Sequence, residues 1–165
     1  MKSNHRTIGR QDFDRLAVST DFLHNKRMST PDKTTAKDIM STDLIQATEE
    51  TTIEEALKIL INYRITGLPV VDGSGKMTGV VSEYDLLNQI SQSKKMDSKV
   101  FNECIHFSKK VDSIPESTPL STIMKEFIDT KYRRLPVVDS DGKLVGIITR
   151  RDLMRVFYYR ARLTG

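Results

Sequence analysis

The 165-residue chain contains no tryptophan, and its only cysteine is Cys104. One thiol cannot form a disulfide within the chain, which fits a reducing compartment, and we expect a cytoplasmic protein. Aromatic residues make up 7% of the chain, too few for base stacking to be the leading mode of nucleic-acid recognition. No apolar run approaches the roughly 20 residues of a membrane-spanning helix, so we expect no membrane span. The first 14 residues have no apolar core and do not resemble a secretory signal.

The chain has a formal net charge of +4, and the excess is uneven. Residues 150–162 carry five arginines against one acid, whereas residues 48–55 carry four glutamates. A modest positive balance favours anionic partners in general, such as nucleotides, nucleic acid or acidic protein surfaces. It does not choose among them.

Residues 68–87 and 135–154 are two copies of one segment, LPVVDGSGKMTGVVSEYDLL and LPVVDSDGKLVGIITRRDLM. The copies are 67 residues apart, need no gap and agree at ten of 20 positions. Most other positions exchange similar residues, such as Val80 for Ile147 and Ser82 for Thr149. A period this long indicates two copies of one supersecondary unit rather than the turns of a solenoid.

The same offset holds upstream of both segments. Apolar residues at 53, 56, 57, 60 and 61 have the spacing of one helix face, and positions 120, 123, 124, 127 and 128 repeat it. Thr52 and Glu55 predict a capping box at the start of the first helix. Thr118 followed by Pro119 predicts a cap residue and a first-turn proline at the start of the second.

Each copy therefore has the predicted order strand, helix, strand, strand, helix. We expect strands at 44–47, 68–71 and 77–81, and again at 112–114, 135–138 and 144–148. Turns at 72–75 and 139–142 would make hairpins of the last two strands in each copy. The final helices would start at Ser82 and Thr149.

One copy of about 55 residues is marginal alone, so two copies related by a pseudo-twofold axis are expected to cover each other. The predicted fold is α+β, with small sheets packed against helices. The predicted divisions are a polar N-terminal arm, repeat 1, a polar linker, repeat 2 and a basic C-terminal tail, at 1–36, 37–90, 91–99, 100–157 and 158–165. Within the arm, residues 11–28 could hold a short helix or be disordered.

Two such copies, each preceded by an amphipathic helix, resemble a tandem pair of CBS domains, the module named after cystathionine β-synthase. The resemblance covers residues 37–157 and includes the opening sequence Lys37-Asp38-Ile39-Met40. It implies a regulatory module without catalysis that binds AMP, ADP, ATP or S-adenosylmethionine in clefts between the repeats. It also implies energy sensing, association into a flat homodimer, and an adenine nucleotide as regulatory ligand rather than a required cofactor.

Ser82-x-x-Asp85 and Thr149-x-x-Asp152 each lie where a strand leads into a helix. A helix N-terminus offers free N–H groups and partial positive charge to an anion. The Ser or Thr hydroxyl can donate to a phosphate or ribose oxygen, and the aspartate can accept from both ribose hydroxyls. The same spacing is also a capping motif, worth about 1 kcal/mol without any ligand. The two interpretations are compatible.

Arg133 and Arg134 precede the first hairpin strand of the second copy, whereas the first copy has Thr66 and Gly67 there. The family pattern implies that basic residues at these positions reach phosphates, for which guanidinium groups suit bidentate donation. The alternative is two solvated arginines. Because Thr66 and Gly67 bring no charge, we expect unequal occupancy of the two clefts.

The family pattern implies two clefts, each built across the pair. The first combines residues of both repeats, with Ile45 and Ile147 sandwiching the base: Thr149, Asp152, Ile147, Ile45, Ile65, Thr66 and Arg133. The second combines Ser82, Asp85, Val80, Asp112, Tyr132 and Arg133, with Asp112 replacing a small apolar residue. For the isoleucines, simple core packing is the alternative.

Other functions compete with nucleotide sensing. A ligand-free scaffold would use the repeats only to dimerise and recruit a protein, and a nucleic-acid binder would use the basic tail. We favour a terminal helix whose Leu153, Val156 and Phe157 pack at a dimer interface while its basic face is solvated. Cys104 and His106 are too few for a zinc site, no phosphate-binding GxxxxGK[ST] loop is present, and no plausible catalytic set is found. We expect no enzyme.

Overall fold

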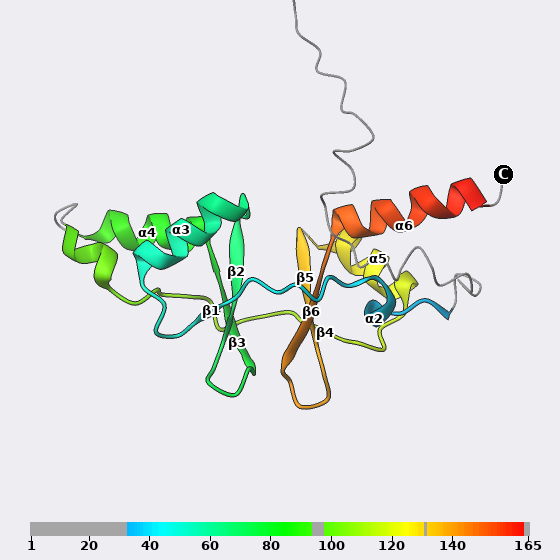
Figure 1. Ribbon diagram of the computed structural model, residues 1–165, viewed down its shortest axis with the longest axis horizontal. Helices are drawn as coiled ribbons and strands as arrows, with labels where there is room; N and C mark the ends of the chain where they lie inside the picture. Colours follow the sequence, from blue (N-terminus) through cyan, green and yellow to red (C-terminus); the bar gives the residue numbers. More distant parts are fainter. Residues whose placement is uncertain (1–32, 94–97, 131, 164–165) are drawn as a thin grey trace, which may run out of the picture.

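The computed structural model describes residues 33–93, 98–130 and 132–163 (Figure 1). The helix suggested within 11–28 lies outside these residues, as does part of the predicted linker. In Figure 1 the sheets of the two repeats lie next to each other at the centre, and the longer helices lie on the outer sides.

Both repeats have the predicted order of elements. The elements of repeat 1 are β1 (Ala47–Thr48), α3 (Ile53–Tyr63), β2 (Gly67–Val71), β3 (Met77–Ser82) and α4 (Glu83–Gln92). The elements of repeat 2 are β4 (Ile114–Pro115), α5 (Leu120–Asp129), β5 (Arg134–Val138), β6 (Leu144–Thr149) and α6 (Arg150–Leu163). The short helices α2 (Ala36–Ile39) and η3 (Ser98–Asn102) are additions that the repeat pattern does not predict.

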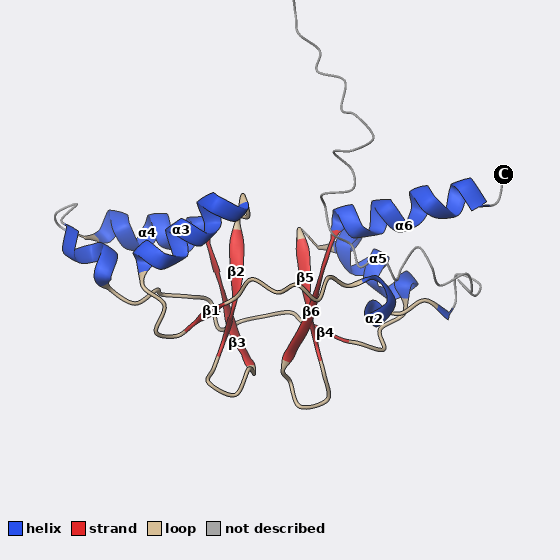
Figure 2. Ribbon diagram, viewed as in Figure 1, coloured by secondary structure: helices blue, strands red, loops and turns tan. Residues whose placement is uncertain are grey.

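Each repeat contains one three-stranded sheet, in the orders β1-β2-β3 and β4-β5-β6 (Figure 2). In both sheets the first pair is parallel and the second pair is an antiparallel hairpin. The hairpin turns depend on Asp72 and Asp139, whose Oδ1 atoms accept backbone N–H groups within their turns. Gly75 and Gly142 follow with φ of 83° and 79°, a conformation that glycine adopts without strain. The α+β duplicated fold is confirmed.

Two chain segments cross between the repeats and pair with the sheet of the other repeat. Ser41 pairs with Ile147 of β6, and Ser108 pairs with Val80 of β3. Each segment lies over a strand glycine. A Cβ on Gly146 would collide with the side chain of Met40, and a Cβ on Gly79 would collide with the ring of Phe107. The glycines therefore permit both crossings.

The crossing segments also exchange core residues. Ala36 and Ile39 of α2 are buried in the core of repeat 2, although their sequence opens repeat 1. Val100 and Ile105 are buried in the core of repeat 1, although their sequence opens repeat 2. The core of each repeat is therefore completed by residues from the chain segment that opens the other repeat.

The start of α5 differs from the prediction. The Thr118 hydroxyl donates to the carbonyl oxygen of Pro115 at 2.7 Å and caps no helix, and Pro119 is the N-cap residue. The first helical N–H, that of Leu120, donates to the carbonyl oxygen of Thr34 at 2.9 Å. A backbone carbonyl distant in sequence thus accepts the hydrogen bond of a first-turn N–H group that a capping side chain would otherwise accept.

Helix α6 also differs from the prediction. It continues to Leu163, so the basic tail predicted at 158–165 is helical through its described part. Leu153 and Val156 are buried in the core of their own repeat, because α2 and β6 pack against this helix. Of the three residues assigned to a dimer interface, only Phe157 stays exposed, at 41%.

Candidate functional site

The two strand-to-helix junctions form capping boxes. Asp85 Oδ2 accepts from the backbone N–H of Ser82 at 2.8 Å and from its hydroxyl at 2.5 Å. Asp152 Oδ2 accepts the equivalent bonds from Thr149 at 2.7 and 2.6 Å. Both carboxylates are half-buried. The capping interpretation is therefore confirmed at both junctions, with one oxygen of each carboxylate used.

The remaining carboxylate oxygens differ between the repeats. Asp152 Oδ1 forms an ion pair with Arg155 at 3.4 Å. Within the described residues, Asp85 Oδ1 has no hydrogen-bond partner. Arg155 was not singled out from the sequence, although its i, i+3 spacing from Asp152 on one helix was a usable signal. A ribose hydroxyl would compete with Arg155 at Asp152 but would meet no competing group at Asp85.

Arg134 reaches across the boundary between the repeats. Its Nη1 donates to the carbonyl oxygen of Gly67 at 2.7 Å, and its Nη2 donates to the Thr66 hydroxyl at 3.3 Å. Arg134 lies opposite Thr149 in the β5–β6 hairpin, and Gly67 lies opposite Ser82 in the β2–β3 hairpin. This one guanidinium therefore connects the strand ends that carry both predicted capping hydroxyls.

Glycine is required at position 67 by close packing. A Cβ there would lie 2.9 Å from the carbonyl oxygen of Val81 on the paired strand. Arg134 occupies the equivalent position of repeat 2, one offset of 67 residues later, and its side chain extends to the Gly67 carbonyl. The two equivalent positions therefore differ. Position 134 carries a long cationic side chain, whereas position 67 offers only its backbone carbonyl.

The boundary carries positive charge. Burial lowers the pKa of the Arg134 guanidinium, neighbouring Arg133 lowers it further, and Glu83 acts in the opposite direction. Arginine stays protonated in proteins despite such shifts. Neither arginine forms an ion pair with a carboxylate in the described part of the chain. Arg133 is exposed. An anion at this boundary would add to the counter-charge of Glu83.

The remaining predicted site residues lie in two surroundings. Ile45 and Ile65 are half-buried against the core of repeat 1, which agrees with the core-packing interpretation for these two. The Tyr132 hydroxyl donates to the Asp112 carboxylate, and this bond is the main cause of the raised pKa of Tyr132. Two of the residues assigned to the second cleft, Asp112 and Tyr132, are therefore in contact, and both are exposed. Thr66, assigned beside Arg133, contacts Arg134 instead.

Three further observations concern metal binding, membrane insertion and the surface outside the predicted site. No group of three or more potential metal ligands occurs among the described residues. No helix in the described ranges is long and apolar enough to cross a membrane. A shallow surface depression of about 540 Å³ is lined by residues of β1, of α3 and of the turn between them, and none of the predicted site residues lines it.

The sequence model of the CBS domain matches residues 36–92 and 104–159. The chain belongs to the CBS domain family. The two matches agree with the two structural repeats, so the chain carries a tandem CBS pair.

Relatives support this assignment in sequence and in structure. The chloroplastic CBS domain-containing protein CBSX1 of Arabidopsis thaliana is 40% identical over 68% of this chain and 58% of its own length. The crystal structure of CBSX2 in complex with AMP is 35% identical, has a TM-score of 0.66, and covers 77% of this chain and 98% of its own. The CBS domain pair of protein MJ0100, in complex with 5-methylthioadenosine and S-adenosyl-L-methionine, is 31% identical, has a TM-score of 0.61, and matches 77% of this chain and 98% of its own.

The curated relatives are longer than the region they share with this chain. The chain spans a little more than half the length of the two chloroplastic plant relatives, at 58% and 55%. It covers only 25% of the L-aspartate semialdehyde sulfurtransferase of Methanocaldococcus jannaschii, at 33% identity. CBS pairs therefore occur both in small proteins and joined to enzymes.

Proposed function

We propose that this CBS pair is a regulatory module that binds an adenine nucleotide, AMP, ADP or ATP, at the boundary between its two repeats. S-adenosylmethionine is the alternative ligand of the same class. Relatives at 35% and 31% identity are solved with AMP and with S-adenosyl-L-methionine, which supports a ligand that contains adenosine. Catalysis is not part of the proposal.

The observation that carries the proposal is the position of Arg134. Its guanidinium lies between the repeats, bonded to two neutral oxygens and beside a second arginine, so it can still serve an anion. A phosphate could take the place of the Gly67 carbonyl or use the remaining guanidinium donors. Binding would then change a contact that joins the repeats, which is how a ligand could alter the geometry passed to a partner.

The other site residues keep their predicted roles within this proposal. Asp152 and Asp85 would accept from ribose hydroxyls, and the Thr149 and Ser82 hydroxyls, which donate to these carboxylates without a ligand, would turn to donate to ligand oxygens. The predicted apolar walls are Ile45, Ile65, Val80 and Ile147, and the predicted polar walls are Thr66, Arg133, Asp112 and Tyr132. We place the stronger site at Asp152, as the family pattern implies.

Isothermal titration calorimetry with AMP, ADP, ATP and S-adenosylmethionine tests the proposal. We expect heat with at least one ligand, a loss of roughly tenfold or more in affinity for Asp152→Ala, and a smaller loss for Asp85→Ala. Asp141→Ala, an exposed position in the hairpin turn at the other end of β6 from Thr149, is the matched control and should bind as the unaltered protein does. Absence of heat at millimolar ligand would exclude the sensor.

A ligand-free scaffold is the second candidate function. It is favoured by the capping bonds, because both aspartates have a structural role without any ligand. This candidate predicts a melting temperature that adenine nucleotides do not change. Binding to nucleic acid through α6 would instead be salt-sensitive and require its arginines.

We further propose that the module acts as a homodimer in the cytoplasm and passes its signal to an effector protein. The exposed apolar helix faces support the dimer. The plant relatives are named as chloroplastic, so localisation by a fluorescent fusion in the source cell is the test of the compartment.

A further inference from the structure

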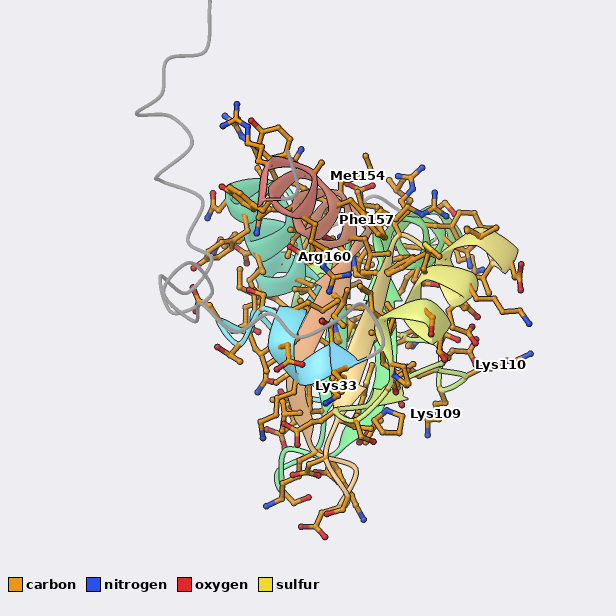
Figure 3. The ribbon with its side chains drawn as sticks, turned by 90° about the vertical axis from the view of Figure 1, so that its right-hand side faces the viewer. Lys33, Lys109, Lys110, Met154, Phe157 and Arg160 are labelled. Carbon is orange, nitrogen blue, oxygen red and sulfur yellow. The ribbon has the colours of Figure 1, made fainter. Side chains whose placement is uncertain are left out.

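The two strand-to-helix junctions are equivalent in position but opposite in charge. Residues 82–88 of repeat 1 hold two carboxylates and no cation, a net charge of −2, whereas residues 149–155 of repeat 2 hold three arginines and one carboxylate, a net charge of +2. The difference includes the position three residues after each aspartate, which is Asn88 in repeat 1 and Arg155 in repeat 2. Figure 3 shows the neighbouring Met154 on α6, the helix that carries Arg155. The two junctions therefore offer a ligand different surroundings.

Of these three arginines, only Arg155 forms an ion pair with Asp152 in the described residues. Its Nη1 lies 3.4 Å from Asp152 Oδ1, and the two side chains are only 25% and 14% exposed. Arg150 instead donates to two backbone carbonyls at the end of α5, and Arg151 is exposed. The other nitrogens of the Arg155 guanidinium form no hydrogen bond within the described ranges, so they remain available to a ligand.

The equivalent side chain in repeat 1 turns to a different partner. Asn88 is exposed, and its side-chain oxygen accepts from the Gln92 amide at 3.3 Å, one turn further along α4. The Oδ1 atom of Asp85 therefore keeps no hydrogen-bond partner in the described part of the chain. A ribose hydroxyl can bond to this oxygen without displacing any group, and the start of α4 provides no cation for a phosphate.

The ion pair at Asp152 makes the binding of a ribose depend on a phosphate. A ribose hydroxyl competes with Arg155 for the same carboxylate oxygen. A guanidinium released from that oxygen is partly buried without its counter-charge, which is unfavourable. A phosphate on the same ligand gives the guanidinium a new anionic partner, for which arginine is well suited. Unphosphorylated adenosine provides no such partner.

We infer that Arg155 is a specificity-determining residue, which makes the junction of repeat 2 prefer phosphorylated adenosine ligands. The junction of repeat 1, with Asn88 at the equivalent position, binds phosphorylated and unphosphorylated adenosine ligands more equally. The inference rests on the nucleotide site proposed above and goes beyond it by assigning a ligand class to each repeat. AMP and adenosine are the matched pair of ligands, because they differ only in the phosphate.

Calorimetric titration with AMP and with adenosine measures this preference as a ratio of two affinities. An Asp85→Ala background removes the proposed site of repeat 1, so that the heat reports the site of repeat 2. In this background Arg155→Asn, which copies repeat 1, should lower the ratio of AMP affinity to adenosine affinity about tenfold, because a charge-assisted bond to phosphate is lost. Adenosine itself should bind at least as tightly as before. Both affinities are measured on the same protein, so a change in the folded fraction cancels in the ratio.

The reciprocal exchange tests the inference in repeat 1. In an Asp152→Ala background, Asn88→Arg should raise the preference for AMP over adenosine, because an arginine at this exposed position can pair with Asp85 as Arg155 pairs with Asp152. Arg162→Asn in the first background is the matched control. It makes the same change in charge on α6, roughly 15 Å along the helix from Asp152, and should leave the ratio unchanged.

Other outcomes would overturn the inference in distinguishable ways. If Arg155→Asn tightens the binding of both ligands by the same factor, Arg155 only competes with the ribose. If it weakens both by the same factor, Arg155 has only a structural role. Either result leaves the proposed nucleotide site standing and removes only the assignment of ligand class. Absence of heat with both ligands in the unaltered protein would instead exclude the nucleotide site, and this inference with it.

Discussion

Replacing Arg134 with alanine should destabilise the protein even without a ligand. The 2.7 Å bond to the Gly67 carbonyl is within the normal range for a charged donor, whereas the 3.3 Å contact with Thr66 is long. One charge-assisted bond contributes about 1.5–3 kcal/mol. Part of this is offset, because the substitution also removes a partly buried cation and its repulsion with Arg133. We therefore expect a net loss of about 1 kcal/mol in the free energy of unfolding.

Urea denaturation followed by circular dichroism measures this loss. The midpoint should fall with an unchanged slope, and the melting temperature should fall by about 2–4 °C for a domain of this size. Arg133→Ala is the matched control, because Arg133 is exposed, and its change should stay within about 0.5 kcal/mol. Equal stability of the Arg134→Ala and Arg133→Ala proteins would refute the reasoning that Arg134 joins the repeats.

Three further predictions concern other parts of the fold. Gly146→Ala should cost about 2 kcal/mol or more of unfolding free energy, because its Cβ would collide with Met40 beneath the crossing segment; an unchanged melting curve would contradict this. The pKa of Glu55 is lowered by its bonds at the start of α3, so its stabilisation is complete above the ordinary value of 4.5 and is lost as pH falls through the lowered pKa. Glu55→Gln should therefore flatten the acid limb of stability against pH, and an acid limb of the same steepness would exclude this role. Asp112→Asn should lower the raised pKa of Tyr132, seen as an earlier step in tyrosinate absorbance on alkaline titration, and an unshifted step would show that the bond is not maintained in solution.

Local patterns predicted most of the secondary structure. The duplicated segment placed the hairpins, because a strand, a turn aspartate and a glycine recur at fixed positions. Thr52 and Glu55 placed the start of α3, where both capping bonds are present. These features depend on residues within a few positions of one another, so a single sequence contains the information needed.

Contacts between distant segments were not predictable in this way. Thr118 failed as a cap because the backbone at Thr34 satisfies the helix start from elsewhere in the chain. The sequence indicated a basic pair at the start of β5 but not that Arg134, rather than Arg133, would reach Thr66. The direction of a side chain at the end of a strand depends on how the other repeat packs against it. No pattern of neighbouring residues predicts that direction.

The exchange of core residues means that neither half of the chain can fold as an independent unit. A fragment ending at 93 would lack Val100 and Ile105 beneath its helices, and a fragment beginning at 98 would lack Ala36 and Ile39. Each fragment supplies what the other is missing, so the two peptides mixed in one tube should reassemble, whereas either peptide alone stays unfolded. The intact protein should consequently melt in one step. A change that destabilises one repeat should therefore destabilise the other repeat as well.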